Sequence, residues 1–334
     1  MIVMENHPIV YGIGNPIVDI IFQATDKDIE ILGLQKGSMS LVTKKQQEDI
    51  IKYFKLENSF MMPGGSAPNT ILACNGLGVP SVLSGKIGND KFGKIYLDQI
   101  NQYNVLSKIA QGKGATGTSI ILITPDAERT MNTHLGMCRE YSEKDIDEEL
   151  LARSSFLYFT GYMWDTDSQK EAIQKAVRIS RSNNVKICFD VADPFVVDRN
   201  KAEFLDFMEE NVDIVFSNKP ELHILFGSKN TEVSTKKLMN MVKYGCVKLG
   251  KKGSVVFNNS QSCKIEPKIV AAKDTTGAGD MYAAGFLSAF SKTNDYIISG
   301  KIGSALAEEI IQINGAQFKK SEMEKVRSKI SKFY

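Results

Sequence analysis

The chain has 334 residues, of which 43% are hydrophobic and 24% are charged, a composition that is ordinary for a folded globular protein. Its length suits one large α/β domain, alone or with a smaller appendage. Because the formal net charge is only +2 and acidic and basic residues are interspersed, the sequence argues against nucleic acid or an anionic membrane surface as a partner.

The first residues and the cysteines favour a reducing, cytoplasmic setting. The start, MIVMENHP, lacks the basic segment and apolar core of a signal peptide, and no apolar run approaches the length of a membrane span. The cysteine count is odd, and the cysteines lack the spacing of a disulfide framework or of a metal site. They are Cys74, Cys138, Cys188, Cys246 and Cys263.

Short apolar runs alternate with amphipathic stretches along most of the chain. Strands are predicted over 9–13, 156–160, 185–190, 212–217, 246–249 and 254–257. Helices are predicted over 68–77, 93–102, 168–182, 202–211, 219–226, 235–244, 278–291 and 301–314. The middle strands are almost wholly apolar, as expected when helices cover both faces of a parallel sheet. The alternation predicts a doubly wound, mostly parallel α/β fold.

Two regions break this pattern. Residues 17–42 and 116–133 alternate apolar and polar residues, as in IVDIIFQA and TGTSIILIT, which is typical of strands with one wet face. We interpret them as a small sheet that stands off the main domain as a lid over a site. The predicted division gives a lid of about 15–42 and 113–133, and a main domain of about 1–14, 43–112 and 134–334.

Several common nucleotide motifs are excluded. The sequence has no G-x-x-x-x-G-K-[ST] loop, and GIGNPI, at residues 12–17, is followed by an alternating strand pattern where a dinucleotide fingerprint needs a helix. With three histidines and no protein-kinase catalytic loop, histidine-based nucleophile schemes and protein-kinase schemes are also disfavoured.

The heptapeptide DTTGAGD, at residues 274–280, precedes an apolar helical run. If a helix begins near Ala278, the N–H groups of Gly277, Ala278 and Gly279 and the positive end of the helix dipole form an anion hole. Asp280 then lies in the first turn, either as a partner of the dipole or as a general base for a hydroxyl that attacks a bound phosphate. The plainer alternative is a Thr-capped helix packed closely on a strand.

Other motifs each allow a purely structural interpretation. Asp19 could simply face water on a lid strand. The segment GGSAPNT, at residues 64–70, could be a tight turn and helix cap. Asn218 and Glu221 have the spacing of a capping box, and KLGKKGSVV, at residues 248–256, reads as a strand, a turn and a strand.

These motifs together resemble the ribokinase-like (PfkB) carbohydrate and nucleoside kinases. DTTGAGDMYAAGF resembles their C-terminal signature, and GGSAPNT followed by GKIGNDKFG resembles their N-terminal signature. Within the family, GIGNPIVDI, TPDAERTMNTHLG, GYMWDT and DPFVVDRNKAEFLDF resemble the adenosine kinases, particularly the bacterial type. The resemblance extends from Tyr11 to about Phe318.

The resemblance implies a role for each matched residue. Asp280 would be the catalytic base, and Gly277, Ala278 and Gly279 would hold the transferring phosphate. The acceptor site would comprise Asn15, Asp19, Gly64, Gly65, Ser66 and Asn69. ATP would contact Asn218, Lys248, Gly250, Gly253, Thr275 and Asn314, and Glu221, acting through water, and Asn218 would bind Mg²⁺.

The resemblance thus implies ATP-dependent phosphorylation of the 5′-hydroxyl of adenosine or a close purine nucleoside, giving AMP and ADP. The alternatives are a sugar kinase that acts on ribose, fructose or a related sugar, and a non-catalytic relative. The residues that sandwich the base cannot be placed, because each candidate could equally belong to the core: Phe22, Tyr162, Met163, Trp164 and Phe195. The sequence leaves open whether the protein is a monomer or a homodimer and whether it depends on a monovalent cation.

Overall fold

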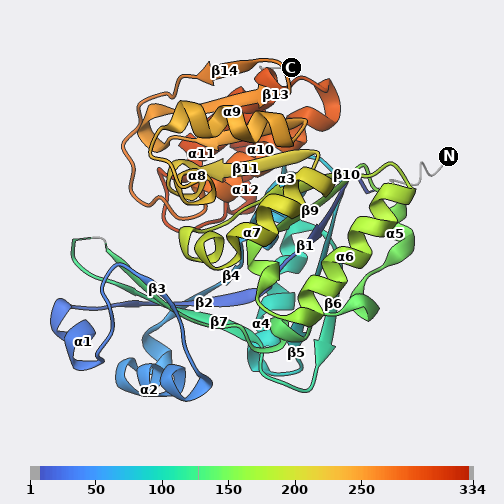
Figure 1. Ribbon diagram of the computed structural model, residues 1–334. Helices are drawn as coiled ribbons and strands as arrows, with labels where there is room; N and C mark the ends of the chain where they lie inside the picture. The colour runs from blue at the N-terminus through green and yellow to red at the C-terminus, as the bar shows by residue number, and fades with distance from the viewer. Residues whose placement is uncertain (1–7, 127, 331–334) are drawn as a thin grey trace.

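A nine-stranded sheet forms the larger part of the protein in the computed structural model, which describes residues 8–126 and 128–330 (Figure 1). Seven strands are parallel, and β13 and β14 join one edge in antiparallel pairing. Residues 1–7, part of the segment in which no signal peptide is expected, lie outside the described residues. In spatial order the strands are β14 (Ser262–Ile265), β13 (Ser254–Asn258), β12 (Tyr244–Lys248), β11 (Ile214–Asn218), β10 (Lys186–Asp190), β9 (Phe156–Thr160), β1 (Val10–Ile13), β5 (Ser81–Gly88) and β6 (Leu106–Gly112).

Helices bury both faces of this sheet. Successive residues of a strand point to opposite faces, so neighbouring residues pack in different apolar clusters. On β9, Phe156 and Tyr158 belong to one apolar cluster, whereas Leu157 and Phe159 belong to the other. The first cluster includes residues of α3 (Ser66–Gly76), α4 (Lys91–Ile100), α10 (Ala278–Thr293), α11 (Tyr296–Ile310) and α12 (Lys320–Ile330). The second includes residues of α5 (Glu148–Ala152), α6 (Asp167–Ser182), α7 (Pro194–Asn211), α8 (Lys219–Phe226) and α9 (Thr231–Met241). The predicted doubly wound fold is confirmed.

A second, five-stranded sheet stands beside the main one, at the lower left of Figure 1. Its order is β3 (Met39–Leu41), β8 (Arg129–His134), β7 (Gly117–Ile123), β2 (Ile17–Gln23) and β4 (Phe60–Gly64). One face, including Val18, Ile20 and Phe22, is buried with residues of α1 (Asp26–Ile31) and α2 (Lys44–Phe54). The strand β4 comes from the range 43–112 that the sequence assigns to the main domain, so the small sheet draws on a third segment of the chain. That this sheet moves as a lid stays a prediction.

The strand order predicts a crevice at the carboxyl ends of the central strands of the main sheet. β1 lies between β9 and β5, so the chain turns to opposite sides of β1, and ligands of such sheets bind beyond the carboxyl ends of the strands at this switch point. Polar residues end or follow several strands there, namely Asn15, Thr160, Asp190, Asn218 and Lys248. Among the helices of the described ranges, none combines the length and the apolar character that a membrane span requires.

Candidate active site

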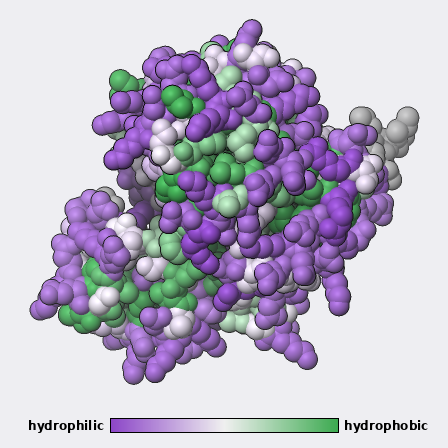
Figure 2. Space-filling view, in the orientation of Figure 1, coloured by the Kyte–Doolittle hydropathy of each residue, from purple (hydrophilic) through white to green (hydrophobic). Residues whose placement is uncertain are grey.

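A cavity of about 950 Å³ lies between the two sheets. Figure 2 shows hydrophobic residues gathered around the hollow between the small sheet and the main body. The small sheet contributes alternate residues of its open face, whereas the main sheet contributes its strand ends and the loop before α10. The apolar part of the small-sheet wall comprises Ile17, Met39, Leu41, Ile121 and Met131.

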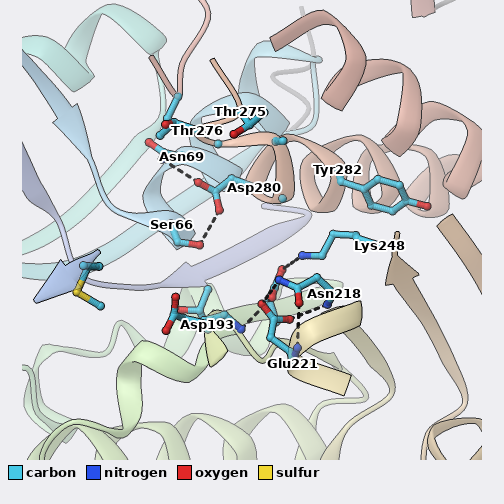
Figure 3. Close-up of a pocket in the computed structure, with 18 of the residues that line it drawn as sticks. Ser66, Asn69, Asp193, Asn218, Glu221, Lys248, Thr275, Thr276, Asp280 and Tyr282 are labelled. Atoms are coloured by element: carbon cyan, nitrogen blue, oxygen red, sulfur yellow. Dashed lines mark hydrogen bonds and ion pairs between the residues drawn. The ribbon is translucent and has the colours of Figure 1, made fainter. Parts of the chain in front are cut away.

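Asp280 lies in the first turn of α10 and faces the cavity. Its carboxylate accepts hydrogen bonds from Ser66 Oγ at 2.6 Å and from Asn69 Nδ2 at 2.9 Å, both on α3 (Figure 3). Burial raises the pKa of Asp280 to about 7, and the two hydrogen bonds act in the opposite direction. A carboxyl whose pKa lies near neutrality can accept a proton from a hydroxyl at physiological pH.

The loop before α10 presents backbone N–H groups to the same cavity. Gly277 is the residue that precedes the helix; its φ is 75°, and a Cβ atom there would lie 2.7 Å from Ala316 Cα. Among the hydrogen bonds of the described residues, none uses the N–H of Gly277 or Gly279, whereas Ala278 N donates to Thr275 O at 3.3 Å. Two of the three predicted donors are therefore open toward an anion, and the third is partly used by the turn.

An ion pair with the small sheet braces this loop. The Asp274 carboxylate, which is 6% exposed, accepts hydrogen bonds from Thr276 N at 2.9 Å and Gly315 N at 2.6 Å. It also pairs with the guanidinium of Arg129 on β8. The first acid of the heptapeptide is thus a structural anchor that ties the small sheet to the loop, whereas the second acid faces the cavity.

Asp19 on β2 is another carboxyl that faces the cavity. It is 8% exposed, and among the described residues no hydrogen bond to its side chain is found. Burial raises the pKa of Asp19 to about 7; the Arg129 guanidinium lowers it, and the Asp280 carboxylate raises it further. A buried carboxyl with unused acceptors is a candidate for binding hydroxyl groups of a ligand.

The predicted acceptor residues line the cavity, with one exception. Asn15, Gly65, Ser66 and Asn69 line the cavity. Gly64 does not line it; a Cβ atom at this position would lie 2.5 Å from Asp19 Cγ, so the glycine makes room for the Asp19 carboxylate.

Lys248, at the end of β12, extends its side chain toward the anion hole (Figure 3). Its Nζ donates to Asp190 Oδ2 at 2.9 Å, and a Cβ atom at Gly279 would lie 3.3 Å from the same Nζ. The ammonium group therefore lies within reach of a phosphate held by the loop. Asp190 is the last residue of the strand predicted over 185–190, and an acid at the carboxyl end of a parallel strand could have been recognised from the sequence.

Asn218 and Glu221 form the predicted capping box at the start of α8. Asn218 N donates to Glu221 Oε2 at 2.6 Å, and Glu221 N donates to Asn218 Oδ1 at 3.0 Å. Glu221 is 1% exposed, and burial raises its pKa to about 7, against the effect of the Lys248 ammonium. No cluster of three or more acidic, histidine or cysteine side chains suited to a metal is found among the described residues.

The remaining predicted contacts differ in position. Gly250, Gly253 and Thr275 line the cavity, and Gly253 has φ 83° in the turn between β12 and β13. Asn314 does not line it and is exposed, because the chain turns inward only from Gly315 onward. Of the aromatic and sulfur candidates for the base, Tyr162, Trp164 and Phe195 line the cavity. Trp164 also belongs to the second apolar cluster, whereas Phe22 and Met163 lie in the apolar clusters without lining the cavity.

Comparisons with known proteins identify the family of this chain. The model of the pfkB family of carbohydrate kinases matches residues 41–323 of the chain. The chain is 33% identical to the adenosine kinase of Sinorhizobium meliloti, whose structure aligns with a TM-score of 0.89 over 97% of this chain and 99% of that one. A probable sugar kinase protein from Rhizobium etli is 30% identical, with a TM-score of 0.91 over 98% of this chain and 100% of its own.

A relative known by sequence points the same way. The adenosine kinase of Dictyostelium discoideum is 26% identical over 340 residues, which cover 92% of this chain and 96% of that protein. Because the family model covers most of the chain and both structures align over nearly all of it, the resemblance inferred from the two signatures is confirmed. This protein belongs to the pfkB family of carbohydrate kinases and is a phosphotransferase that acts on an alcohol.

Proposed function

We propose that this kinase transfers the γ-phosphoryl group of ATP to the 5′-hydroxyl of adenosine or a close purine nucleoside, giving AMP and ADP. The observation that carries the proposal is the placement of two buried carboxyls, Asp19 and Asp280, on either side of a cavity that ends at the open N–H groups of Gly277 and Gly279. The 33% identity to a bacterial adenosine kinase over nearly the whole chain supports a nucleoside as the acceptor.

Each part of the cavity suits one part of the two substrates. The Asp19 carboxylate can accept two hydroxyl hydrogens of a ribose at once. The apolar wall of Ile17, Ile121 and Met131 lies beside Asp19 and offers a surface for a flat base, with Tyr162 and Trp164 also lining the cavity. Phosphates would lie at the start of α10, next to Lys248.

The reaction needs little covalent chemistry from the protein. The hydroxyl oxygen of the acceptor attacks the γ-phosphorus, the bond from that phosphorus to the bridging oxygen of ADP breaks, and the hydroxyl proton passes to Asp280. The N–H groups of Gly277 and Gly279 and the Lys248 ammonium stabilise the charge on the phosphoryl oxygens. Catalysis is therefore mainly positioning and electrostatics, and closure over the site would exclude water.

The residues present fit Mg²⁺ that is held mostly by ATP. Mg²⁺ prefers oxygen ligands and usually binds through one or two carboxylates, several waters and substrate phosphates. The buried carboxyls of Glu221 and Asp190 lie near Lys248 at the phosphate end of the cavity, where they could accept hydrogen bonds from waters bound to the ion. The ion would neutralise charge on the ATP phosphates.

A sugar kinase is the second candidate, because the chain is also 30% identical to a probable sugar kinase protein. The observation that favours adenosine is the size of the apolar wall beside Asp19, which a free sugar would leave uncovered. A cytoplasmic role in purine salvage goes with the proposal.

Initial rates with a panel of acceptors distinguish these candidates. We expect adenosine to have the highest kcat/KM in a coupled assay of ADP formation across adenosine, inosine, guanosine, ribose and fructose, because only a nucleoside contacts both Asp19 and the apolar wall. ADP formation without an acceptor is the control for ATP hydrolysis. A higher kcat/KM for ribose or fructose would replace the nucleoside assignment with the sugar kinase.

The pKa values near neutrality predict a pH dependence. The pKa of Asp280 and that of Asp19 are both raised to about 7, so both carboxyls are largely protonated at pH 6 and ionised at pH 8. A protonated Asp280 cannot accept the hydroxyl proton, so kcat/KM should rise from pH 5 to about pH 7.5 and then level off. Because the two carboxyls interact, the limb reports an apparent pKa of the pair. A profile that is flat down to pH 5 would contradict the proposed base.

A further inference from the structure

A hydrogen-bonded relay approaches Asp280 from behind the site. Gln317 lies in the segment between α11 and α12, and its Nε2 donates to Asn69 Oδ1 at 2.7 Å and to Pro63 O at 3.0 Å. Asn69 Nδ2 in turn donates to Asp280 Oδ2 at 2.9 Å. Gln317 and Asn69 are 6% and 5% exposed, so water has little access to these groups.

The relay has a fixed polarity. Pro63 O is a backbone carbonyl on β4 and can only accept, so the amide nitrogen of Gln317 must face it. The second N–H of that nitrogen then faces Asn69 and requires the carbonyl oxygen of Asn69 on its side. The Asn69 amide nitrogen is left pointing at Asp280. The Gln317 Oε1 atom has no partner among the described residues, so the buried amide is held through its nitrogen alone.

We propose that Gln317 is a positioning residue, which fixes the orientation of the Asn69 amide and so keeps a hydrogen-bond donor, instead of an acceptor, against the Asp280 carboxylate. The inference rests on the proposed function, in which Asp280 is the base. If the Asn69 amide were reversed, its carbonyl oxygen would face the carboxylate and disfavour the ionised form of Asp280 that accepts the proton.

Several other groups also act on Asp280 and set the background for any test. The charged side chains that face it are Asp19 on β2, Asp190 at the end of β10 and Lys248 on β12. The buried phenol of Tyr158 and the partly buried phenol of Tyr162 are close enough to interact with it electrostatically. None of these residues is changed in the variants below, so a change in the pH profile reports the relay.

The relay also joins elements that the reaction must keep in register. Pro63 pairs with Val18 in the small sheet, beside Asp19, while Asn69 lies on α3 of the main domain. Gln317 contacts both, and its neighbour Ala316 packs against Gly277 in the anion-hole loop. The segment after α11 thus supports the acceptor strand, the base and the phosphate loop together.

The test replaces Gln317 by methionine, which has similar length and no donor. In Gln317→Met, Asn69 Oδ1 loses its donor and the amide is free to turn. We expect the apparent pKa of the acidic limb of kcat/KM to rise by roughly 0.5–1 unit, with most of the activity regained at pH 9. The same substitution in an Asn69→Ala background should cause no further rise, because the group that Gln317 orients is gone.

A matched control is a glutamine that donates to the same strand, β4. Gln99 on α4 donates through Nε2 to Met61 O, two residues before Pro63, and its Oε1 is also buried without a partner among the described residues. Since no hydrogen bond links Gln99 to Asn69, Gln99→Met should lower the thermal midpoint without moving the pH profile. Gln317→Glu is the second variant, in case Gln317→Met fails to fold. Its carboxyl cannot donate to both acceptors, so it should also raise the apparent pKa of the acidic limb of kcat/KM. This rise should be smaller in the Asn69→Ala background.

The outcomes separate the two proposals. The role of Gln317 would be overturned if a folded Gln317 variant left the apparent pKa of the acidic limb unchanged, or if the rise were equally large in the Asn69→Ala background. In either case, an inactive Asp280→Asn would still support Asp280 as the base. Near-normal turnover in Asp280→Asn would overturn both.

Discussion

Replacing Asp280 by asparagine should lower kcat by roughly 10²–10⁴, the usual contribution of a positioned general base. Asparagine has the size of aspartate and can keep both contacts, because the Ser66 hydroxyl can accept from the new amide nitrogen while Asn69 Nδ2 still donates to its oxygen. The N–H groups of Gly277 and Gly279 are unchanged, so ATP binding should be largely retained.

Thermal stability tells catalysis from structure at this position. A carboxyl whose pKa is raised in the folded protein binds more protons than in the unfolded chain, so its contribution to stability falls as pH rises from about 4 to 7. Asp280→Asn removes this effect and should not lower the thermal midpoint at pH 8. If Asp280 served only the helix dipole, the change would cost about 0.3–1 kcal/mol of stability and leave turnover nearly intact.

Replacing Asp19 by alanine should lower kcat/KM for the acceptor by about one to two decades, mostly through KM. The reason is the loss of charge-assisted hydrogen bonds to the ribose hydroxyls, which contribute roughly 1.5–3 kcal/mol. Because the Asp19 side chain makes no hydrogen bond in the described part of the chain, its removal leaves no hydrogen-bond partner unsatisfied in the folded protein. The KM for ATP should change little.

The control for Asp19 is an acid on the same side of the molecule with an exposed partner. Asp26 on α1 pairs with Lys36 at 2.6 Å, and its side chain is 72% exposed. Asp26→Ala should therefore leave both KM values unchanged, since exposed ion pairs contribute little. An unaltered KM for the acceptor in folded Asp19→Ala would remove Asp19 from the acceptor site.

Local patterns account for what could be predicted from the sequence. The capping box of Asn218 and Glu221 and the helix that begins at Ala278 depend on residues a few positions apart, so their spacing alone indicates them. The alternation in β2 and β7 predicts the small sheet. Its strand β4 is not predicted, because FMMPG is short and contains proline and glycine, which weaken a strand signal.

Contacts between distant segments could not be predicted in this way. Arg129 and Asp274 are 145 residues apart, and Asn69 and Gln317 are 248 residues apart. No local spacing links such partners; they meet because the fold brings β8 to the loop before α10 and the segment after α11 to α3. The same holds for Gly64, whose lack of a side chain is explained only by the Asp19 carboxylate that packs against it.

The central claim is tested most directly by locating the transferred phosphate. The protein is incubated with ATP, Mg²⁺ and adenosine, and the product is identified by ³¹P NMR, with 5′-deoxyadenosine as the matched acceptor that lacks the attacking hydroxyl. The proposal predicts stoichiometric AMP and ADP from adenosine and no phosphorylated product from 5′-deoxyadenosine. With Asp280→Asn, AMP should form from adenosine at no more than about 1% of the wild-type rate. Failure to form AMP by a preparation that phosphorylates ribose or fructose would contradict it.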